Sequence, residues 1–442
     1  IDGRYSSQSK CLRPYFSEFA LIKHRVLVEI KWFECMVEKG IVKLDNTDDY
    51  KEVLQKIIYS FDVKEAEKVK DIEKKTNHDV KAVEYYLKDK FDENEELKKN
   101  KEFLHFTCTS EDINNLSYAL MLKNAVEEVL LPKLESLIHT IREKAHAYAS
   151  IPMMSRTHGQ SATPTTVGKE LANFVYRVTR QIKIIKELKP LGKFNGAVGN
   201  FNAHVVTFPD LDWEELAQEF VESLGIEYNP YSTQIEPHDS LAQISNAFSL
   251  ANTILIDFAR DMWGYISLGY FKQLTIAGEV GSSTMPHKVN PINFENGEGN
   301  LGLSNSMFSF FSSKLPISRF QRDLSDSTVM RNLGVAFAYS ISAYAALERG
   351  LARIEVNEEV VVGEVDQHYE LLAEVVQTVM RKYEIENPYE KLKGFTRGKN
   401  VTKEDFDIFI NGLELPEEEK ITLLELTPSK YIGIAPILAK KV

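Results

Sequence analysis

The residues best suited to chemistry lie in the stretch 278–300, GEVGSSTMPHKVNPINFENGEGN. Two adjacent hydroxyls, Ser282 and Ser283, precede a cation, Lys288, and an amide, Asn290. This set suits removal of a proton from a carbon beside a carboxylate, because serine can serve as base while the cation and the amide stabilise the developing negative charge. The same glycine, serine, proline and asparagine content is typical of an ordinary surface loop. Residue types alone leave both interpretations open.

Two kinds of nucleotide-binding loop can be set aside. Gly281 and Lys288 are too far apart for a P-loop, G-x-x-x-x-G-K-[ST], and Val289 stands where that motif needs a hydroxyl. The glycines of LGKFNGAVGN, residues 191–200, follow a helical pattern rather than a strand. That order argues against a dinucleotide-binding fold.

A histidine in a second polar stretch is a candidate proton donor. His158 lies at the centre of SRTHGQSATPTTVGKE, residues 155–170, where Gly159 and Pro164 predict a loop ahead of a helix. An imidazole with a pKa near neutrality can give up a proton at working pH. A lone histidine is more often structural, so the spacing alone does not decide its role.

Three further clusters have both a binding and a structural interpretation. Arg322 and Arg331 flank hydroxyls in QRDLSDSTVMRN, a combination that suits phosphate or carboxylate, although a capped helix start at Ser327 with salt-bridged arginines fits nearly as well. In TNHDV, residues 76–80, helix capping accounts for the residues around His78 but does not need the histidine itself. Capping also explains Thr109 and Ser110 ahead of an acid.

These clusters interrupt long stretches with helical spacing of apolar residues. Such spacing extends over residues 113–141, where Pro132 predicts a kink or a new start, and over Val167–Leu188 and Leu241–Phe271. Within the last, Ala247–Phe258 is apolar nearly all round, which predicts a bundle centre or a subunit interface. The best strand candidate is the short Ala203–Phe208.

The predicted class is therefore all-α, with three helical domains. We expect an N-terminal domain over residues 1–107, a central long-helix bundle over 108–349 that assembles into a tetramer core, and a smaller C-terminal domain over 350–442. The length of 442 residues exceeds the size at which one core usually stops growing.

Composition excludes several classes of protein. A net charge of −12 argues against nonspecific binding to nucleic acid or to an anionic membrane. Three cysteines, Cys11, Cys35 and Cys108, lack metal-ligand spacing, which predicts free thiols, a reducing compartment and no structural zinc. The chain has neither an apolar run of about 18 residues nor a signal pattern at its start. We therefore expect a cytoplasmic protein.

The order of residues in these stretches adds a resemblance. GSSTMPHKVNP resembles the signature of the fumarase/aspartase superfamily, and its MPHK form is similar to the adenylosuccinate lyase family. The motifs IDGRY, TNHDVKAVEYYLK, CTSEDINNL, RTHGQSATP, NGAVGN, TQIEPHD, DSTVMRN and TPSKYIG extend the resemblance to the longer bacterial type over essentially the whole chain. The alternative is another enzyme of the same superfamily, such as a carboxymuconate cycloisomerase.

The resemblance implies roles for particular residues. The implied catalytic residues are Ser282 as the base, His158 as the acid, and His78 and Lys288. The implied substrate-binding residues are Arg4, Tyr5, Asn77, His78, Asp79, Thr109, Ser110, Gln234, Ser283, Lys288, Val289, Asn290, Asn296, Arg322, Ser327, Thr328, Val329, Met330 and Arg331.

The activity implied by the resemblance is elimination of fumarate from two succinylated purine precursors. These are adenylosuccinate, which gives AMP, and succinylaminoimidazole carboxamide ribotide, which gives the free carboxamide. The resemblance further implies small nucleotide substrates, no cofactor or metal, and a homotetramer whose active sites combine residues from different subunits.

Overall fold

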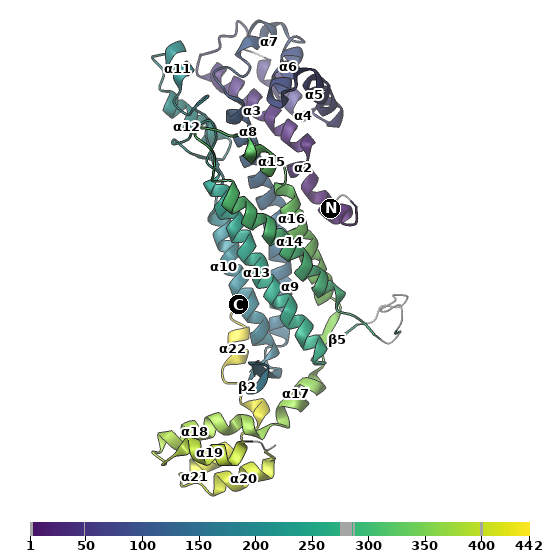
Figure 1. Ribbon diagram of the computed structural model, residues 1–442, viewed down its shortest axis with the longest axis vertical. Helices are drawn as coiled ribbons and strands as arrows, with labels where there is room; N and C mark the ends of the chain where they lie inside the picture. The colour runs from purple at the N-terminus through teal and green to yellow at the C-terminus, as the bar shows by residue number, and fades with distance from the viewer. Residues whose placement is uncertain (1–2, 48, 275–284, 286–287, 398–400) are drawn as a thin grey trace. The chain divides into compact units, whose positions relative to one another are not determined.

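The regular structure of the described residues is almost entirely helical. A computed structural model describes residues 3–47, 49–274, 285, 288–397 and 401–442. The all-α class is confirmed, and within the described ranges the β structure amounts to short two-stranded sheets (Figure 1). The helices are α1 (Ser6–Ser9), η1 (Lys10–Leu12), α2 (Arg13–Phe16), α3 (Glu18–Glu38), α4 (Tyr50–Tyr59), α5 (Val63–Thr76), α6 (Asp79–Phe91), α7 (Glu95–Lys99), η2 (Lys101–Phe103), α8 (Ser110–Ala125), η3 (Val126–Leu130), α9 (Leu131–Ala147), α10 (Val167–Glu187), α11 (Asn202–Thr207), α12 (Trp213–Ser223), α13 (Asp239–Ser267), α14 (Ile292–Lys314), α15 (Ser325–Met330), α16 (Leu333–Leu351), α17 (Glu358–Asp366), η4 (Tyr369–Leu372), α18 (Ala373–Lys382), α19 (Pro388–Thr396), α20 (Lys403–Asn411), α21 (Glu417–Leu424), η5 (Pro428–Lys430) and α22 (Ala435–Ala439). The strands are β1 (Pro152–Thr157), β2 (Gln160–Thr166), β3 (Leu191–Gly192), β4 (Glu227–Tyr228), β5 (Phe271–Gln273) and β6 (Ile354–Val356).

The chain divides into two units, each made of three separate stretches. The first unit comprises Ile1–Leu134, Gln181–Thr253 and Asn300–Ser342, and the second comprises Glu135–Arg180, Ile254–Gly299 and Ala343–Val442. The expected three-domain division at residues 107 and 349 stays a prediction.

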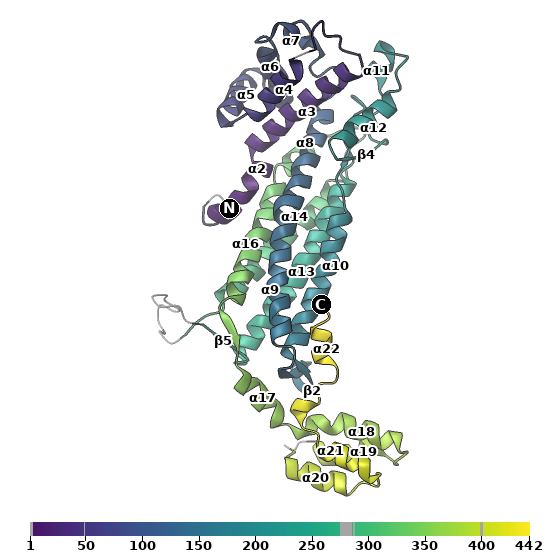
Figure 2. The same cartoon turned by 180° about the vertical axis from the view of Figure 1, so that it is seen from behind.

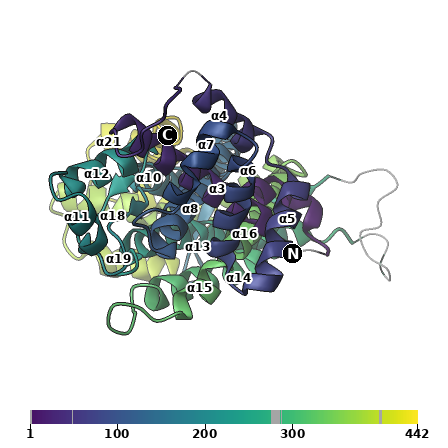
Figure 3. The ribbon, with the colours of Figure 1, turned by 90° about the horizontal axis from the view of Figure 1, so that it is seen from above.

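Helix α3 begins and ends as local rules dictate. Its N-cap Ser17 accepts a hydrogen bond from Ala20 N, which satisfies one of the free amides of the first turn. Gly40 follows the helix with a φ of 72°, a left-handed conformation that favours glycine, and Ile41 N then donates to Met36 O at 2.9 Å. Helix α3 packs on α8 in the first unit (Figures 1 and 3).

An aromatic cluster lies in the core of the first unit. The Trp32 ring lies 4.4 Å from Phe194 and 5.1 Å from Phe220, measured between ring centroids. Trp32 Nε1 donates to Phe106 O at 3.0 Å, so its polar atom is satisfied although the side chain is fully buried. This cluster ties α3 and α12 to the segment that follows β3.

The first-unit parts of α13, α14 and α16 pack through edge-to-face ring contacts and a buried polar contact. Phe337 lies 5.2 Å from Phe248 and 5.0 Å from Phe308 between ring centroids. Asn252 Nδ2 donates to Ser340 Oγ at 2.9 Å, and all these side chains are buried. A hydrogen-bonded polar pair in an apolar bundle favours one register of the helices.

Pro132 coincides with a change of helix geometry, as its position predicted. The π-helical turn η3 immediately precedes α9, whose second residue is Pro132. A proline lacks the amide proton and clashes with the preceding turn, and a wider turn accommodates both effects.

Two local predictions were wrong. The strand proposed for Ala203–Phe208 is helix α11, because Phe201 takes a left-handed φ of 55° and starts a helix there. The loop proposed for residues 155–170 is largely a β-hairpin, β1 paired with β2, followed directly by α10. The turn signal at Gly159 was real, but the flanking residues pair with each other.

The C-terminal helices of the second unit have a core of their own. Helices α18, α19, α20 and α21 lie together (Figures 1 and 2), and buried Leu372, Val376, Met380, Phe406 and Ile410 belong to that core. In the part of the chain that the structure describes, no helix is long and apolar enough to cross a membrane.

Candidate active site

Arg331 lies in a chain of ion pairs on the first unit. It follows the end of α15, and its guanidinium meets Glu18 Oε2 at 2.9 Å and Asp79 Oδ2 at 3.3 Å. Arg25, buried on α3, donates to the same Asp79 oxygen at 2.7 Å. Burial raises the pKa of Asp79, but the charge and hydrogen bond of Arg25 outweigh it, so the pKa lies below its usual value. Asp79 is therefore a carboxylate held between two guanidinium groups.

The second predicted arginine continues this chain. Arg322 Nη1 lies 3.1 Å from Glu111 Oε1, and Nη2 lies 3.6 Å from Asp326 Oδ1. Asn114 joins the two arginine centres, since it accepts from Arg25 Nε and donates to Glu111, both at 2.8 Å. The ion pairs suggested as the plain alternative do exist, and the carboxylates of the protein are the partners of both guanidinium groups.

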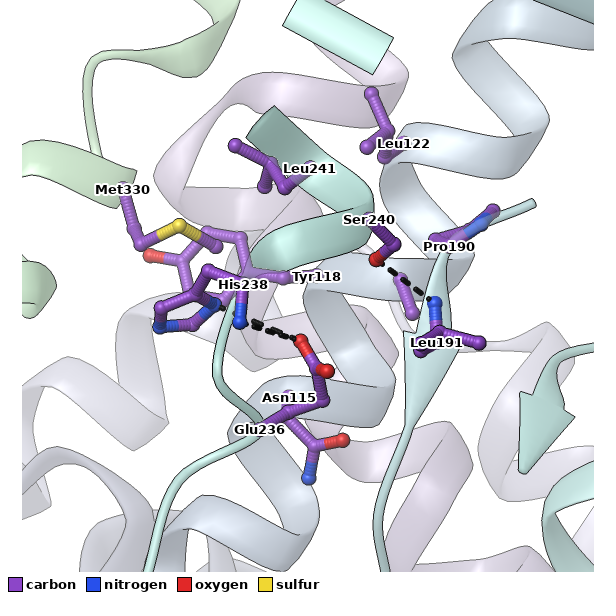
Figure 4. A pocket seen from close by; sticks show the side chains of 11 residues that line it. Asn115, Tyr118, Leu122, Pro190, Leu191, Glu236, His238, Ser240, Leu241 and Met330 are labelled. Atoms are coloured by element: carbon purple, nitrogen blue, oxygen red, sulfur yellow. Dashed lines mark hydrogen bonds and ion pairs between the residues drawn. The ribbon is translucent and has the colours of Figure 1, made fainter. Parts of the chain in front are cut away.

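A small pocket lies beside this network (Figure 4). His238 Nε2 lies 3.2 Å from Asp326 Oδ2, and Glu236 Oε2 accepts from His238 N at 2.8 Å. Burial raises the pKa of Glu236, against the opposing effect of His238. The lining residues are Asn115, Tyr118, Ala119, Leu122, Pro190, Leu191, Glu236, His238, Ser240, Leu241 and Met330.

A fully buried ion pair fixes the start of α8. Lys193 Nζ lies 2.9 Å from Asp112 Oδ1, and both side chains have an exposed fraction of 0%. Asp112 also accepts from Thr109 N at 2.8 Å and from Asn195 N at 3.1 Å. The capping interpretation of Thr109 is thus supported, and its partner Asp112 holds Thr109 and the half-buried Ser110 beside the 195–200 turn.

Gln234 belongs to the same part of the first unit. Its Nε2 donates to Ala197 O at 3.3 Å, and Asn195 Nδ2 donates to Ser232 Oγ at 2.8 Å. Gly199 has a φ of 82°, and an added Cβ would lie 2.5 Å from Ser232 O. The glycine therefore allows the turn to approach the segment that carries Gln234.

His78 has a structural function that the sequence did not suggest. It is the N-cap of α6, and its Nδ1 accepts from Lys81 N at 3.2 Å. Asn77 ends α5 with a left-handed φ of 52°. The expectation that capping does not need the histidine was wrong, because a ring nitrogen can accept as a carboxylate or hydroxyl does. The side chain of His78 is exposed and close to Asp79.

The hydroxyls between the arginines lie on a short helix. Helix α15 begins at Ser325, two residues before the expected start at Ser327, and Asp323 Oδ1 accepts from Ser325 N at 2.8 Å. Met330 is buried against the pocket, whereas Thr328 is exposed. The half-buried residues Ser327 and Val329 lie on the same helix.

At the N-terminus of the first unit, Tyr5 is in contact with α14. Asn300 Nδ2 donates to Tyr5 OH at 3.4 Å. The neighbouring Arg4 is exposed. Nothing further in the described contacts assigns Arg4 a role.

The predicted acid, His158, is in the second unit, at the tip of the β1–β2 hairpin. Thr157 pairs with Gln160, so His158 and Gly159 form a two-residue turn, and their φ angles are 55° and 75°. Two positive φ values are the mark of a type I′ turn, which suits the twist of the flanking strands. The imidazole is exposed at the tip of the hairpin.

The residues of the 278–300 stretch are partly described. Ser282 and Ser283 lie outside the described residues. Lys288 and Val289 are exposed, and Val289 O accepts from Gln273 Nε2 at 2.5 Å. Asn290 and Asn296, the latter on α14, are half-buried in the second unit.

Sequence reasoning missed several residues of the network. Arg25, Asp112 and Lys193 are buried, and their partners lie far away in the sequence. A signal existed for Arg25, since it lies among apolar residues of α3 that face the core. A charged residue in such a position needs a partner.

Comparison with known proteins identifies the family. Residues 3–303 match a family described as Lyase, and residues 318–432 match one described as Adenylosuccinate lyase C-terminal. The chain is 54% identical to "Adenylosuccinate lyase" of Haemophilus influenzae over 100% of its length and 97% of that protein, and 55% identical to that of Escherichia coli over 98% and 96%. The chain belongs to the adenylosuccinate lyase family.

Solved structures of other enzymes share this fold. A fumarate lyase from Mesorhizobium superposes with a TM-score of 0.77 at 17% identity, covering 97% of this chain and 96% of that one. A 3-carboxy-cis,cis-muconate lactonizing enzyme from Pseudomonas putida gives 0.75 at 19% identity, covering 97% and 95%. These likenesses concern the fold, whereas membership of the adenylosuccinate lyase family identifies the chain as a lyase.

Proposed function

We propose that this enzyme eliminates fumarate from adenylosuccinate to give AMP, and from succinylaminoimidazole carboxamide ribotide to give the free carboxamide. The observation that carries the proposal is the identity of 54% to an adenylosuccinate lyase along the whole chain. The alternative, a carboxymuconate cycloisomerase, rests on a likeness of fold at 19% identity.

The proposed chemistry is acid and base catalysis. Ser282 removes the proton from the succinyl carbon, and His158 protonates the departing nitrogen. Because serine is a weak base and the carbon a weak acid, the negative charge of the intermediate must be stabilised. Lys288 and Asn290 are the proposed donors, each preorganised donor being worth roughly 3–4 kcal/mol.

The remaining predicted residues bind the substrate. Arg331 and Arg322, with the hydroxyls of α15, offer the groups that bind phosphate or carboxylate. When Arg331 binds a substrate anion, that anion replaces Glu18 as its partner. Asp79 remains paired with the guanidinium of Arg25. The substrate anion thus enters a site whose positive charge is already oriented.

We further propose a cytoplasmic homotetramer whose active sites combine residues of different subunits. Three side chains on α13 and α14 support it, since Leu250, Leu303 and Phe310 are about half exposed, at 49%, 52% and 52%. Exposed apolar residues on long helices indicate a surface that another subunit covers. The three cysteines are free, in keeping with a reducing compartment.

One experiment tests both the activity and the shared site. We expect the wild type to release fumarate from adenylosuccinate but to leave carboxymuconate and argininosuccinate unchanged, as followed by absorbance. Ser282→Ala should abolish turnover, and His158→Ala should leave only a trace that a steady-state assay does not detect. If the two residues reach a site from different chains, refolding an equal mixture of the variants restores about one quarter of the sites. Half of the chains that supply the histidine are intact at residue 158 and half of those that supply the serine are intact at residue 282, so about one site in four has both.

The outcomes separate the two claims. Turnover of carboxymuconate in place of adenylosuccinate would refute the proposed substrate. Mixed tetramers, verified by mass, that stay inactive would refute the shared site, and a monomer by light scattering would refute the tetramer.

A further inference from the structure

The hairpin that carries His158 is held near its turn by a three-residue polar cluster. Arg156 on β1 donates through Nη2 to Glu364 Oε1 at 2.6 Å and to Tyr270 OH at 3.3 Å. Tyr270 OH also donates to the second oxygen of Glu364. The three side chains come from three separate segments, β1, α17 and the residue before β5. Arg156 lies only two residues from His158, so the cluster acts close to the turn.

Apolar contacts and a second polar contact hold the same hairpin. Buried Met154, next to a bulge in β1, packs with Val365 of α17 and with Leu371 of η4. On β2, Thr163 Oγ1 donates to Glu374 of α18. The hairpin is therefore fixed along both strands by helices that follow residue 357.

The tyrosine of the cluster stays protonated at neutral pH. Burial and the hydrogen bond to Glu364 raise the pKa of Tyr270 to about 12, so its hydroxyl remains a donor at neutral pH. Tyr270 has an exposed fraction of 1%, and its carbonyl accepts from Asn357 N at 2.8 Å. The buried tyrosine therefore offers Arg156 a partner that is itself held in place by packing and by a backbone hydrogen bond.

We propose that Arg156, Glu364 and Tyr270 are positioning residues that set the place of His158 for proton transfer. This proposal rests on the proposed role of His158 as the acid. A type I′ turn transmits the orientation of its strands to its two central residues, so a tilt of β1 at Arg156 displaces the imidazole. A displacement of about 1 Å at a catalytic group costs on the order of 100-fold in rate.

The test measures kcat and KM for adenylosuccinate in Glu364→Ala. We expect kcat to fall about 10- to 100-fold, with KM changed by less than about 3-fold, because the substrate-binding arginines are untouched. The loss should be uniform across pH 6–9. The conservative variant Glu364→Gln should recover most of the rate, since its amide oxygen can still accept from Arg156 while its NH2 group donates to the hydroxyl oxygen of Tyr270.

The decisive comparison repeats Glu364→Ala in a His158→Ala background, where the residual rate is read by single turnover. If the cluster acts through His158, Glu364→Ala causes no further loss there. An equal loss in both backgrounds, or no loss in the first, overturns the proposal. Fumarate release by the wild type reports separately on the proposed function.

The chain offers a matched control of the same chemistry. Glu419 accepts from Lys382 Nζ at 2.6 Å and from Tyr383 OH at 2.8 Å, a cation, carboxylate and tyrosine cluster among the C-terminal helices. Glu419→Ala should leave kcat within about 2-fold of the wild type. If Glu364→Ala does not fold, Tyr270→Phe replaces it, because the ring keeps its packing and the hydroxyl alone is lost. The same comparison in the two backgrounds then applies.

Discussion

A buried histidine of the first unit makes the stability of that unit depend on pH. His204 on α11 has an exposed fraction of 1%, and its ring lies 4.8 Å from Trp213 and 5.2 Å from Phe201 between centroids. Within the described part of the chain, neither ring nitrogen has a hydrogen-bond partner. Burial therefore lowers the pKa of His204 from 6.5 to about 4.

The sign and the size of the effect follow from linkage. Between pH 6.5 and 4 the unfolded chain takes up a proton on His204 that the folded state does not. The contribution of the neutral His204 to the free energy of unfolding is therefore fully present above pH 6.5 and is lost as the pH falls. Each pKa unit is worth about 1.4 kcal/mol. The free energy of unfolding therefore falls by about 2 kcal/mol at pH 5 and by about 3 kcal/mol below pH 4, relative to its value above pH 6.5.

The perturbation is His204→Phe, which keeps the aromatic packing but removes the titratable group. When the pH is lowered from 8 to 5, we expect the free energy of unfolding of the variant to rise by about 2 kcal/mol relative to that of the wild type. The assay is urea unfolding followed by tryptophan fluorescence, to which Trp213, beside the histidine, contributes. The difference between the two proteins isolates His204 from the other groups that titrate.

The matched control is His139→Phe, at a histidine whose side chain has an exposed fraction of 65%. The difference in free energy of unfolding between His139→Phe and the wild type should be the same at pH 8 and pH 5. A difference for His204→Phe that is the same at pH 8 and pH 5 would show that the buried ring titrates normally and would refute the reasoning.

Two further predictions concern charged residues of the same unit. Lys193→Met leaves Asp112 buried without its cation and should cost about 3 kcal/mol in urea unfolding, whereas Lys99→Met, at an exposed pair, should leave unfolding unchanged. Similar effects of both variants would contradict the assigned burial. Arg331→Ala should weaken adenylosuccinate binding at least 10-fold by calorimetry on the inactive Ser282→Ala background, and an unchanged Kd would leave Arg331 a purely structural role.

The sequence alone was sufficient for the class, the long helices and the family. Spacing over Val167–Leu188 predicted α10, Val167–Glu187, because helical periodicity is a property of neighbouring residues. Leu241–Phe271 was less accurate at its end, since Phe271 begins β5. Helix ends depend on caps and contacts that periodicity does not record.

The tertiary structure decided which charges meet. Arg331 pairs with Glu18, 313 positions away in the sequence, and Lys193 is buried beside Asp112. No local pattern encodes such pairs, because the partner depends on how α3, α6 and α15 pack. The arginine cluster was therefore predictable as a group of cations, but its counter-ions were not.

The hairpin around His158 was also predicted in part by local sequence and decided in part by tertiary contacts. The sequence marked a turn at Gly159, but a strand gains stability only from its partner strand and from the helices that cover it. Those helices follow residue 357, and their contacts through Arg156 and Met154 turn a polar stretch into two paired strands. Local propensity placed the histidine on a turn, and long-range packing decided that the residues on either side pair as strands.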